Sequence, residues 1–263
     1  MSIRQVENRL VGVDRVLATL RELAHHPNGV ALEELAQRLG QPKSSIHRAL
    51  AALRRFALVQ QDEDRRYRLS LEFVGLAFRY YESLEEQVLV NPTLEALATR
   101  LSETAHYAVL DGADVIYVAK VTPPDVGFKM AATVGGRQPA HSTALGKVLL
   151  AHALRGEGEV RRFVAAQGPL RKKTPGTLTT AAALARELAA TRERGYALDD
   201  QENEPGVNCI AFAVFTGPRE RPAGAISVSA VAQRTPVARL AEQAEEIRAL
   251  IEERLGAVTR AHR

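Results

Sequence analysis

Residues 40–55 read GQPKSSIHRALAALRR, a turn followed by a basic amphipathic helix. Gly40 suits the left-handed position after a helix end, and Pro42 cannot continue the preceding helix. Apolar residues then recur at helical spacing, namely Ile46, Ala49, Leu50 and Leu53. We therefore predict a helix over residues 43–55 that begins directly after a tight turn.

The flanking residues extend this pattern into a small domain. Helical periodicity precedes the turn at residues 13–24 and 32–39, with a Pro-Asn-Gly break at 27–29. Two short helices joined by a glycine-containing turn form a helix-turn-helix. After the basic helix, VQQ at 59–61 and YRL at 67–69 flank a polar tip, which predicts a β-hairpin, or wing. We predict a winged helix-turn-helix over residues 8–70.

Positive charge is concentrated in this segment. Residues 1–70 hold 12 Lys and Arg against 8 Asp and Glu, and the rest of the chain holds 23 of each sign, so the net charge of +4 lies here. Residues 35–61 contain no carboxylate. A local basic patch is typical of a protein that binds a polyanion. The alternatives are a solvated surface and a three-helix module that docks a protein.

The predicted DNA contacts lie on the basic helix and the wing. Helix N-terminal residues reach base edges in the major groove, and arginine pairs with guanine. On the face opposite the apolar stripe we expect the short or basic side chains Lys43, Ser44, Ser45, His47 and Arg48. Arg54 and the wing residues Arg65 and Arg66 are expected at phosphates or the minor groove. The predicted partner is double-stranded operator DNA.

The composition narrows the class of protein. Of the 263 residues, 46% are hydrophobic and 25% charged, the balance of an ordinary globular protein. The single cysteine, Cys209, excludes an internal disulfide and a cysteine-rich zinc site, and we expect neither metal nor cofactor. No stretch reaches the roughly 20 apolar residues of a membrane span, and the N-terminus lacks a signal-peptide pattern. We expect a cytoplasmic protein without a membrane partner.

A second helical stripe follows the wing. Phe73, Leu76, Ala77, Tyr80 and Leu84 recur at helical spacing, and Pro92 comes soon after them. We predict a linker helix over residues 71–90. Its stripe is too regular for a loose linker, so it packs either on a second copy of the chain or on its own domain.

The remaining residues, 91–258, alternate between strand and helix patterns. Strands are expected at 105–110, 115–121, 128–134, 196–199, 207–215 and 223–231, with an Asp-Gly hairpin turn at 111–112. Helices are expected at 94–100, 142–154, 181–194 and 236–255. Hairpins mixed with helices predict an α+β domain with a mostly antiparallel sheet.

Several features in this half bear on catalysis. Cys209 lies in an apolar strand, where a buried inert thiol is the common case. The acidic run at 199–204 has no companion histidine, and Gly146-Lys147 lacks the rest of a phosphate loop. Ser227 and Ser229 share one strand face, which suits either a small ligand or solvent. We expect that the protein is not an enzyme. The alternatives are an enzyme that uses Cys209 and a sensor that does not bind DNA.

The combination resembles the IclR family of regulators. The turn and basic helix at 40–48 resemble its winged helix-turn-helix, and HSTALGKVLLA at 141–151 resembles a second family block. The family signature follows at matching spacing: Gly195, Asp199, Glu202, Cys209-Ile210-Ala211 and Val214-Phe215. Thr216 stands where the signature normally ends in Asp or Asn. The likeness covers about residues 8–255.

The resemblance implies a fold and a pocket. The C-terminal half is then a GAF-like α/β effector-binding domain that takes a small organic acid or related metabolite, and the assembly is a homodimer or a dimer of dimers. The apolar residues Met130, Val207 and Phe128 beside hydroxyls favour an aromatic or short aliphatic acid. The implied pocket residues are Met130, Ala144, Leu145, Asp199, Cys209, Ser227 and Ser229. We expect a ligand-responsive transcriptional regulator, a repressor of a catabolic or metabolic operon, in which effector binding shifts the linker helix and the recognition helices.

Overall fold

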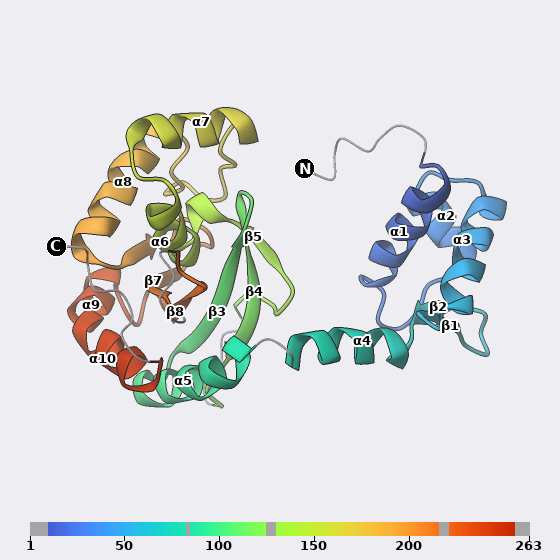
Figure 1. Ribbon diagram of the computed structural model, residues 1–263, viewed down its shortest axis with the longest axis horizontal. Helices are drawn as coiled ribbons and strands as arrows, with labels where there is room; N and C mark the ends of the chain where they lie inside the picture. The colour runs from blue at the N-terminus through green and yellow to red at the C-terminus, as the bar shows by residue number, and fades with distance from the viewer. Residues whose placement is uncertain (1–9, 83–84, 125–129, 216–220, 256–263) are drawn as a thin grey trace. The chain divides into compact units, whose positions relative to one another are not determined.

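A computed structural model describes residues 10–82, 85–124, 130–215 and 221–255. The chain forms two compact units, Met1–Leu84 and Glu85–Arg263, which we describe separately (Figure 1). Among the described residues, no helix has both the length and the apolar composition that crossing a bilayer requires.

The first unit is a winged helix-turn-helix. It contains α1 (Gly12–Leu23), α2 (Leu32–Arg38), α3 (Lys43–Arg55), the antiparallel hairpin β1 (Val59–Gln61) and β2 (Tyr67–Leu69), and α4 (Leu71–Glu82). Gly40 has φ +60°, the left-handed conformation predicted for the turn between α2 and α3. Val30 forms an isolated antiparallel bridge with Tyr67, which ties the chain before α2 to the hairpin.

The core of this unit consists of the apolar stripes of α1, α2 and α3. Leu23, Leu35, Ile46 and Leu50 are almost fully buried and pack with Val59 and Tyr67 of the wing. Because each helix contributes residues three or four apart, one cluster fixes the orientation of α3. The prediction of helices, turn and wing is confirmed.

The linker region differs from the expected helix over residues 71–90 at its C-terminal end. The structure has α4, described to Glu82, and α5 (Glu85–Leu101), which continues through Pro92; residues 83–84 lie outside the described ranges. A proline inside a helix loses one hydrogen bond and normally favours a break. Here Val90, Leu94, Leu97 and Ala98 of α5 are buried in the core of the second unit, and this packing outweighs the proline.

The second unit is built on a six-stranded sheet in the order β5-β4-β3-β8-β7-β6, and every pairing in it is antiparallel. The strands are β3 (Thr104–Asp111), β4 (Asp114–Val121), β5 (Arg137–Pro139), β6 (Ala197–Asp200), β7 (Val207–Val214) and β8 (Gly224–Val231). The predicted hairpin turn is present, with Gly112 at φ +64°. The α+β class with a mostly antiparallel sheet is confirmed.

Helices cover both faces of this sheet (Figure 1). On one face, α5, α9 (Val237–Glu242) and α10 (Ala244–Leu255) pack on Tyr107, Phe212 and Ile226. On the other face lie α6 (Ala144–Ala153), α7 (Glu157–Gln167) and α8 (Ala181–Arg194). The strands present alanines to α6, at positions 108, 211, 213 and 225, so this helix approaches the sheet closely.

Three expectations for this unit need correction. The chain around residue 130 is not a strand in its described part, Met130 to Val134; residues 128–129 lie outside the described ranges. Its backbone groups bond to side chains instead: the carbonyls of Met130 and Ala132 accept from Lys120 Nζ at 3.4 and 2.8 Å. β5 pairs with β4 in its place.

The helix boundaries account for the other two corrections. Ser142 belongs to a 3-10 turn, Ala140–Ser142, and α6 starts at Ala144 after its cap Thr143. The expected helix over 236–255 is two helices, separated at Gln243. Leu240, Ala244 and Ile247 on either side of the break enter the same core cluster, so the apolar spacing alone does not reveal it. α7 was not expected.

Candidate functional site

The outer face of α3 carries most of the predicted DNA-contacting residues. Ser44, His47 and Arg48 are exposed, and Lys43 is exposed while its Nζ lies 2.6 Å from Glu33 Oε1. The expectation that Ser45 shares this face is wrong, since its side chain is only 8% exposed. Ser45 lies one turn before Ala49 and beside Ile46, which places it on the edge of the buried stripe.

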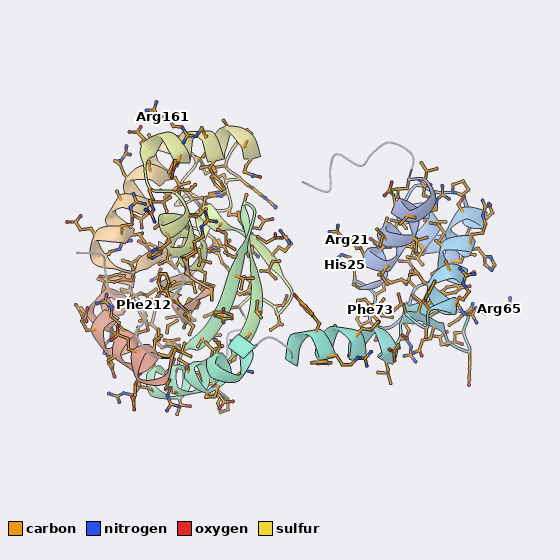
Figure 2. All side chains as sticks on the ribbon, in the orientation of Figure 1. Arg21, His25, Arg65, Phe73, Arg161 and Phe212 are labelled. Atoms are coloured by element: carbon orange, nitrogen blue, oxygen red, sulfur yellow. The ribbon has the colours of Figure 1, made fainter. Side chains whose placement is uncertain are left out.

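The other three predicted arginines lie on the wing and at the end of α3. Arg65 occupies the hairpin turn, with φ +59°, and projects into solvent (Figure 2). Arg54 at the end of α3 donates from a guanidinium nitrogen to Gln61 Oε1 at 3.3 Å. Arg66 instead points its guanidinium at its own domain, donating to the Gly29 carbonyl at 3.1 and 3.2 Å. Arg66 therefore fastens the wing to the loop before α2.

In the second unit, one cavity lies between the sheet and the start of α6. All seven residues predicted from the resemblance line it. Seven further residues complete the wall: His106, Tyr117, Ala132, Thr143, Asn203, Glu204 and Val207. The cavity volume is about 20 Å³, roughly the space that one water molecule needs.

Strand register explains why distant residues meet here. Asp199 of β6 pairs with Cys209 of β7, and Cys209 pairs with Ser229 of β8. Directly paired residues in antiparallel strands point to the same face, so the three side chains stand in a row. Ser227 lies two residues from Ser229 and therefore on the same face. His106 of β3 pairs with Ser227.

Hydrogen bonds link this row. The Cys209 thiol donates to Ser229 Oγ at 3.2 Å, and Ser229 Oγ lies 3.3 Å from His106 Nδ1. Burial raises the pKa of the Cys209 thiol well above its usual value, and the negative charge of Asp199 acts in the same direction. A thiol held in its protonated form is a poor nucleophile. Cys209 is thus a polar wall residue of the cavity.

The start of α6 supplies backbone donors at the opposite wall. Thr143 caps the helix by accepting from Gly146 N–H at 2.9 Å. The N–H groups of Ala144 and Leu145, in the first turn, have no carbonyl partner within the helix. Unpaired N–H groups at a helix N-terminus attract anions, so this wall is suited to a carboxylate.

Asp199 brings an acid group to the same cavity. Its Oδ1 accepts from the backbone N–H of Glu202 at 2.6 Å and of Asn203 at 3.4 Å, which holds the chain after β6 in a turn. Burial raises the pKa of Asp199 to about 7, although the charge of Lys147 opposes this rise. Near neutral pH both the protonated and the ionised form of this carboxyl group are therefore populated.

Lys147 holds the turn after β6 in place through an ion pair with Glu202. Its side chain is 1% exposed, and Nζ forms an ion pair with Glu202 and lies 3.8 Å from Glu187 Oε1 of α8. Thr177 Oγ1 donates to the Glu202 carbonyl at 2.6 Å. Two carboxylates of the acidic run at 199–204, Asp199 and Glu202, are therefore buried in this network rather than solvated. Among the described residues, no group of three or more His, Cys, Asp or Glu is placed to hold a metal ion.

Comparison with known proteins places both units in one family. Residues 12–63 match the IclR helix-turn-helix domain, and residues 79–253 match the description "Bacterial transcriptional regulator IclR C-terminal". The chain belongs to the IclR family of bacterial transcriptional regulators. It is therefore a regulator and not an enzyme. Thr216, at which the sequence departs from the family signature, lies outside the described residues.

Individual IclR-family relatives agree over most of their length. The chain is 32% identical over 240 residues to the HTH-type transcriptional regulator XynR of Escherichia coli, covering 89% of this chain and 92% of that protein. It is 33% identical over 231 residues to the transcriptional repressor IclR of Escherichia coli, covering 87% and 82%. A solved IclR homolog from Microbacterium hydrocarbonoxydans, complexed with 4-hydroxybenzoate, has a TM-score of 0.75 at 25% identity, covering 91% of this chain and 98% of that one.

Proposed function

We propose that this regulator is a ligand-responsive repressor of a catabolic or metabolic operon, released or retained on its operator by a small organic acid. The observation that carries the proposal is the cavity of the second unit. It combines serine hydroxyls, a thiol and the N-terminus of α6 with apolar side chains such as Met130 and Val207. Small-ligand sites combine apolar walls with a few placed polar groups in this way.

An acid is the ligand class that these walls favour. The N–H groups at the start of α6 suit a carboxylate, and Asp199 is partly protonated near neutral pH, which reduces its repulsion of an anion. The solved homolog that is complexed with 4-hydroxybenzoate supports the same class. Because the cavity holds about one water molecule, entry of such an acid requires lining side chains to move, and the flexible Met130 is suited to that.

On the DNA side, we assign base reading to the exposed residues of α3. Ser44, His47 and Arg48 project from the helix, and Lys43 and Arg54 flank them. Arg65 on the wing is assigned to the phosphate backbone. Ser45 is buried and Arg66 is bonded to Gly29, so we assign both a structural role within the unit. The relative named a repressor supports that mode of regulation.

We also propose that the regulator acts as a homodimer, or a dimer of dimers, with contacts through α4. In this helix Leu71 is 83% exposed and Phe78 is 58% exposed, and Val74 lies between them on the same face. Exposed large apolar side chains in a row mark an interaction surface. A second copy of the chain is the natural partner, because a dimer presents two recognition helices to two half-sites.

Calorimetric titration of the full chain with 4-hydroxybenzoate, benzoate, pyruvate and propionate tests the ligand proposal. We expect at least one acid to bind, and Ser227→Ala to weaken that binding. Thr179→Ala, which removes an exposed hydroxyl outside the cavity, serves as the matched control. Thr179→Ala should bind the acid as tightly as the wild type does. The proposal fails if no acid binds to the wild type, or if Ser227→Ala binds the acid as tightly as Thr179→Ala does.

A further inference from the structure

His106 of β3 is a buried imidazole in the wall of the cavity. Its side chain is 2% exposed, and it lines the cavity together with Ser227 and Ser229. The ring packs edge-on against Tyr117, with ring centroids 5.3 Å apart. Its Nε2 atom has no hydrogen-bond partner among the residues that the structure describes. A buried polar atom without a partner is costly, so a native protein that retains one requires an explanation.

The ring is neutral, which leaves two possible tautomers. Burial, and to a smaller extent the positive charge of Lys120, lower the pKa of His106 to about 3. A neutral imidazole carries one hydrogen, so one ring nitrogen donates a hydrogen bond and the other accepts one. Nε2 is therefore a hydrogen-bond donor if Nδ1 is an acceptor, and an acceptor if Nδ1 is a donor.

The neighbouring hydrogen bonds favour one tautomer. Cys209 Sγ donates to Ser229 Oγ at 3.2 Å, so the thiol hydrogen occupies a lone pair of this oxygen. The hydroxyl has one hydrogen of its own, and among the described residues His106 Nδ1, at 3.3 Å, is the acceptor that the structure gives it. With Nδ1 accepting, the ring proton resides on Nε2. The Cys209–Ser229–His106 chain thus turns Nε2 into a donor.

We propose that His106 is a specificity-determining residue, whose Nε2–H donates a hydrogen bond to an oxygen of the bound effector. This inference rests on the proposed function of the cavity and refines its ligand class. Since the N-terminus of α6 is suited to the carboxylate of the effector, His106 donates its hydrogen bond to a second oxygen of the same molecule. The favoured effector is a carboxylic acid that also carries a hydroxyl or oxo group.

The tautomer is tested without any ligand. Nitrogen-15 NMR of the full chain labelled at histidine reports which ring nitrogen carries the proton, and loss of signals in His106→Gln assigns the residue. We expect protonated Nε2 and bare Nδ1 in the wild type. Ser229→Ala, which removes the hydrogen that Nδ1 accepts, is expected to reduce this preference. A proton on Nδ1 of the wild type would overturn the proposal.

The contact is tested with two pairs of probes that differ by one oxygen: 4-hydroxybenzoate with benzoate, and pyruvate with propionate. We expect the wild type to prefer the oxygen-bearing member of at least one pair. His106→Asn retains a polar atom near Ser229 but has none at the Nε2 position, so it should lower that affinity about 10- to 100-fold and abolish the preference. His106→Gln, whose amide nitrogen extends to about the Nε2 position, should restore part of both.

The outcomes separate the inference from the function on which it rests. Thermal unfolding of each variant first establishes that it is folded. Wild-type affinity and an intact preference in a folded His106→Asn would overturn the role of His106 alone. Absence of binding of all four acids to the wild type would overturn the proposed function, and with it the inference, whereas operator binding is measured independently of both.

Discussion

Gly146 shows how a single residue sets the position of the α6 N-terminus. A Cβ atom at this position would lie 2.2 Å from the Ala140 carbonyl oxygen and 2.3 Å from Ala140 Cα. Backbone atoms cannot yield as a flexible side chain can, so only glycine allows α6 to pack against the preceding turn. The first turn of α6, where Ala144 and Leu145 line the cavity, depends on this close approach.

We expect Gly146→Ala to lower the free energy of unfolding by about 1–3 kcal/mol, because the added methyl group overpacks a buried contact. Urea denaturation measures the effect. Gly158→Ala is the control: it lies in α7, and its Cβ would meet only Arg162 Nη1 at 3.7 Å. This control should be neutral or stabilising by about 0.5–1 kcal/mol. Equal stability of the two variants would show that the contact with Ala140 is relaxed.

Asp199 gives the second unit a specific pH dependence. Because its folded pKa of about 7 lies above the unfolded value, its contribution to stability is complete at low pH and is lost as pH rises to about 7. Asp199→Asn mimics the protonated form and keeps an oxygen acceptor. We expect the variant to gain stability relative to the wild type from about pH 4 to about pH 7, by at most about 1.4 kcal/mol per pH unit.

Urea unfolding between pH 4 and pH 8 measures this difference. Asp200→Asn provides the comparison, since Asp200 is the exposed neighbour on the same strand. A stability difference between Asp199→Asn and the wild type that does not change with pH would contradict the assigned burial of Asp199.

Arg48 is the residue on which base reading is expected to depend most. Its guanidinium is exposed on the outer face of α3, where it can pair with guanine. Arg48→Ala should weaken operator binding by about 1–3 kcal/mol, or roughly 5- to 150-fold. Fluorescence anisotropy on an operator selected from random duplexes measures the change. Arg21→Ala removes the same charge from α1 and should have a smaller effect; equal losses would indicate non-specific attraction only.

Part of the site follows from residue patterns, and part depends on which strands pair. Alternation along β8 indicates that Ser227 and Ser229 share a face. It does not indicate that β8 lies beside β3, and the contact between Ser229 and His106 joins residues 123 positions apart. His106, Tyr117 and Asn203 were missed for this reason. The signals available for them were weak: a histidine in an apolar strand and an amide beside the acidic run.

At the scale of elements, α3 and α4 illustrate two different origins of stability. The apolar stripe of α3 predicts its bounds because its own unit buries it. α4 also has helical periodicity, but large apolar side chains on both of its faces are exposed within the unit, namely Leu76 and Tyr80 of the predicted stripe and Leu71, Val74 and Phe78 of the proposed dimer face. Periodicity indicates a helix with an apolar face, whereas the partner of that face has to come from elsewhere. The same limit explains why the passage of α5 through Pro92 could not be predicted from the sequence.

Disruption of the α4 face tests the proposed dimer. Phe78→Glu places a charge on an exposed apolar position, so it should leave the unit folded but weaken self-association by at least about 10-fold, as burying an unpaired charge is costly. Sedimentation equilibrium of the full chain measures association. Phe56→Glu makes the same change at a residue that is 69% exposed at the end of α3. A dimer that tolerates Phe78→Glu as well as Phe56→Glu would exclude α4 as the interface.

At the scale of the whole molecule, the two units are expected to be coupled in free energy. The first carries the basic outer face of α3 and the second carries the cavity of Asp199, Cys209 and Ser229. An effector regulates transcription only if it binds the DNA-competent and DNA-incompetent states with different affinity. Coupling between two sites in such proteins is typically about 1–3 kcal/mol, or 5- to 150-fold in affinity.

The most direct test of this account is the affinity of the full chain for its selected operator, measured by fluorescence anisotropy across a titration of the acid that binds most tightly. The account predicts that saturating acid changes operator affinity at least about 5-fold, and that Ser227→Ala shifts the change to higher acid concentration. Operator affinity that is identical with and without saturating acid would contradict it.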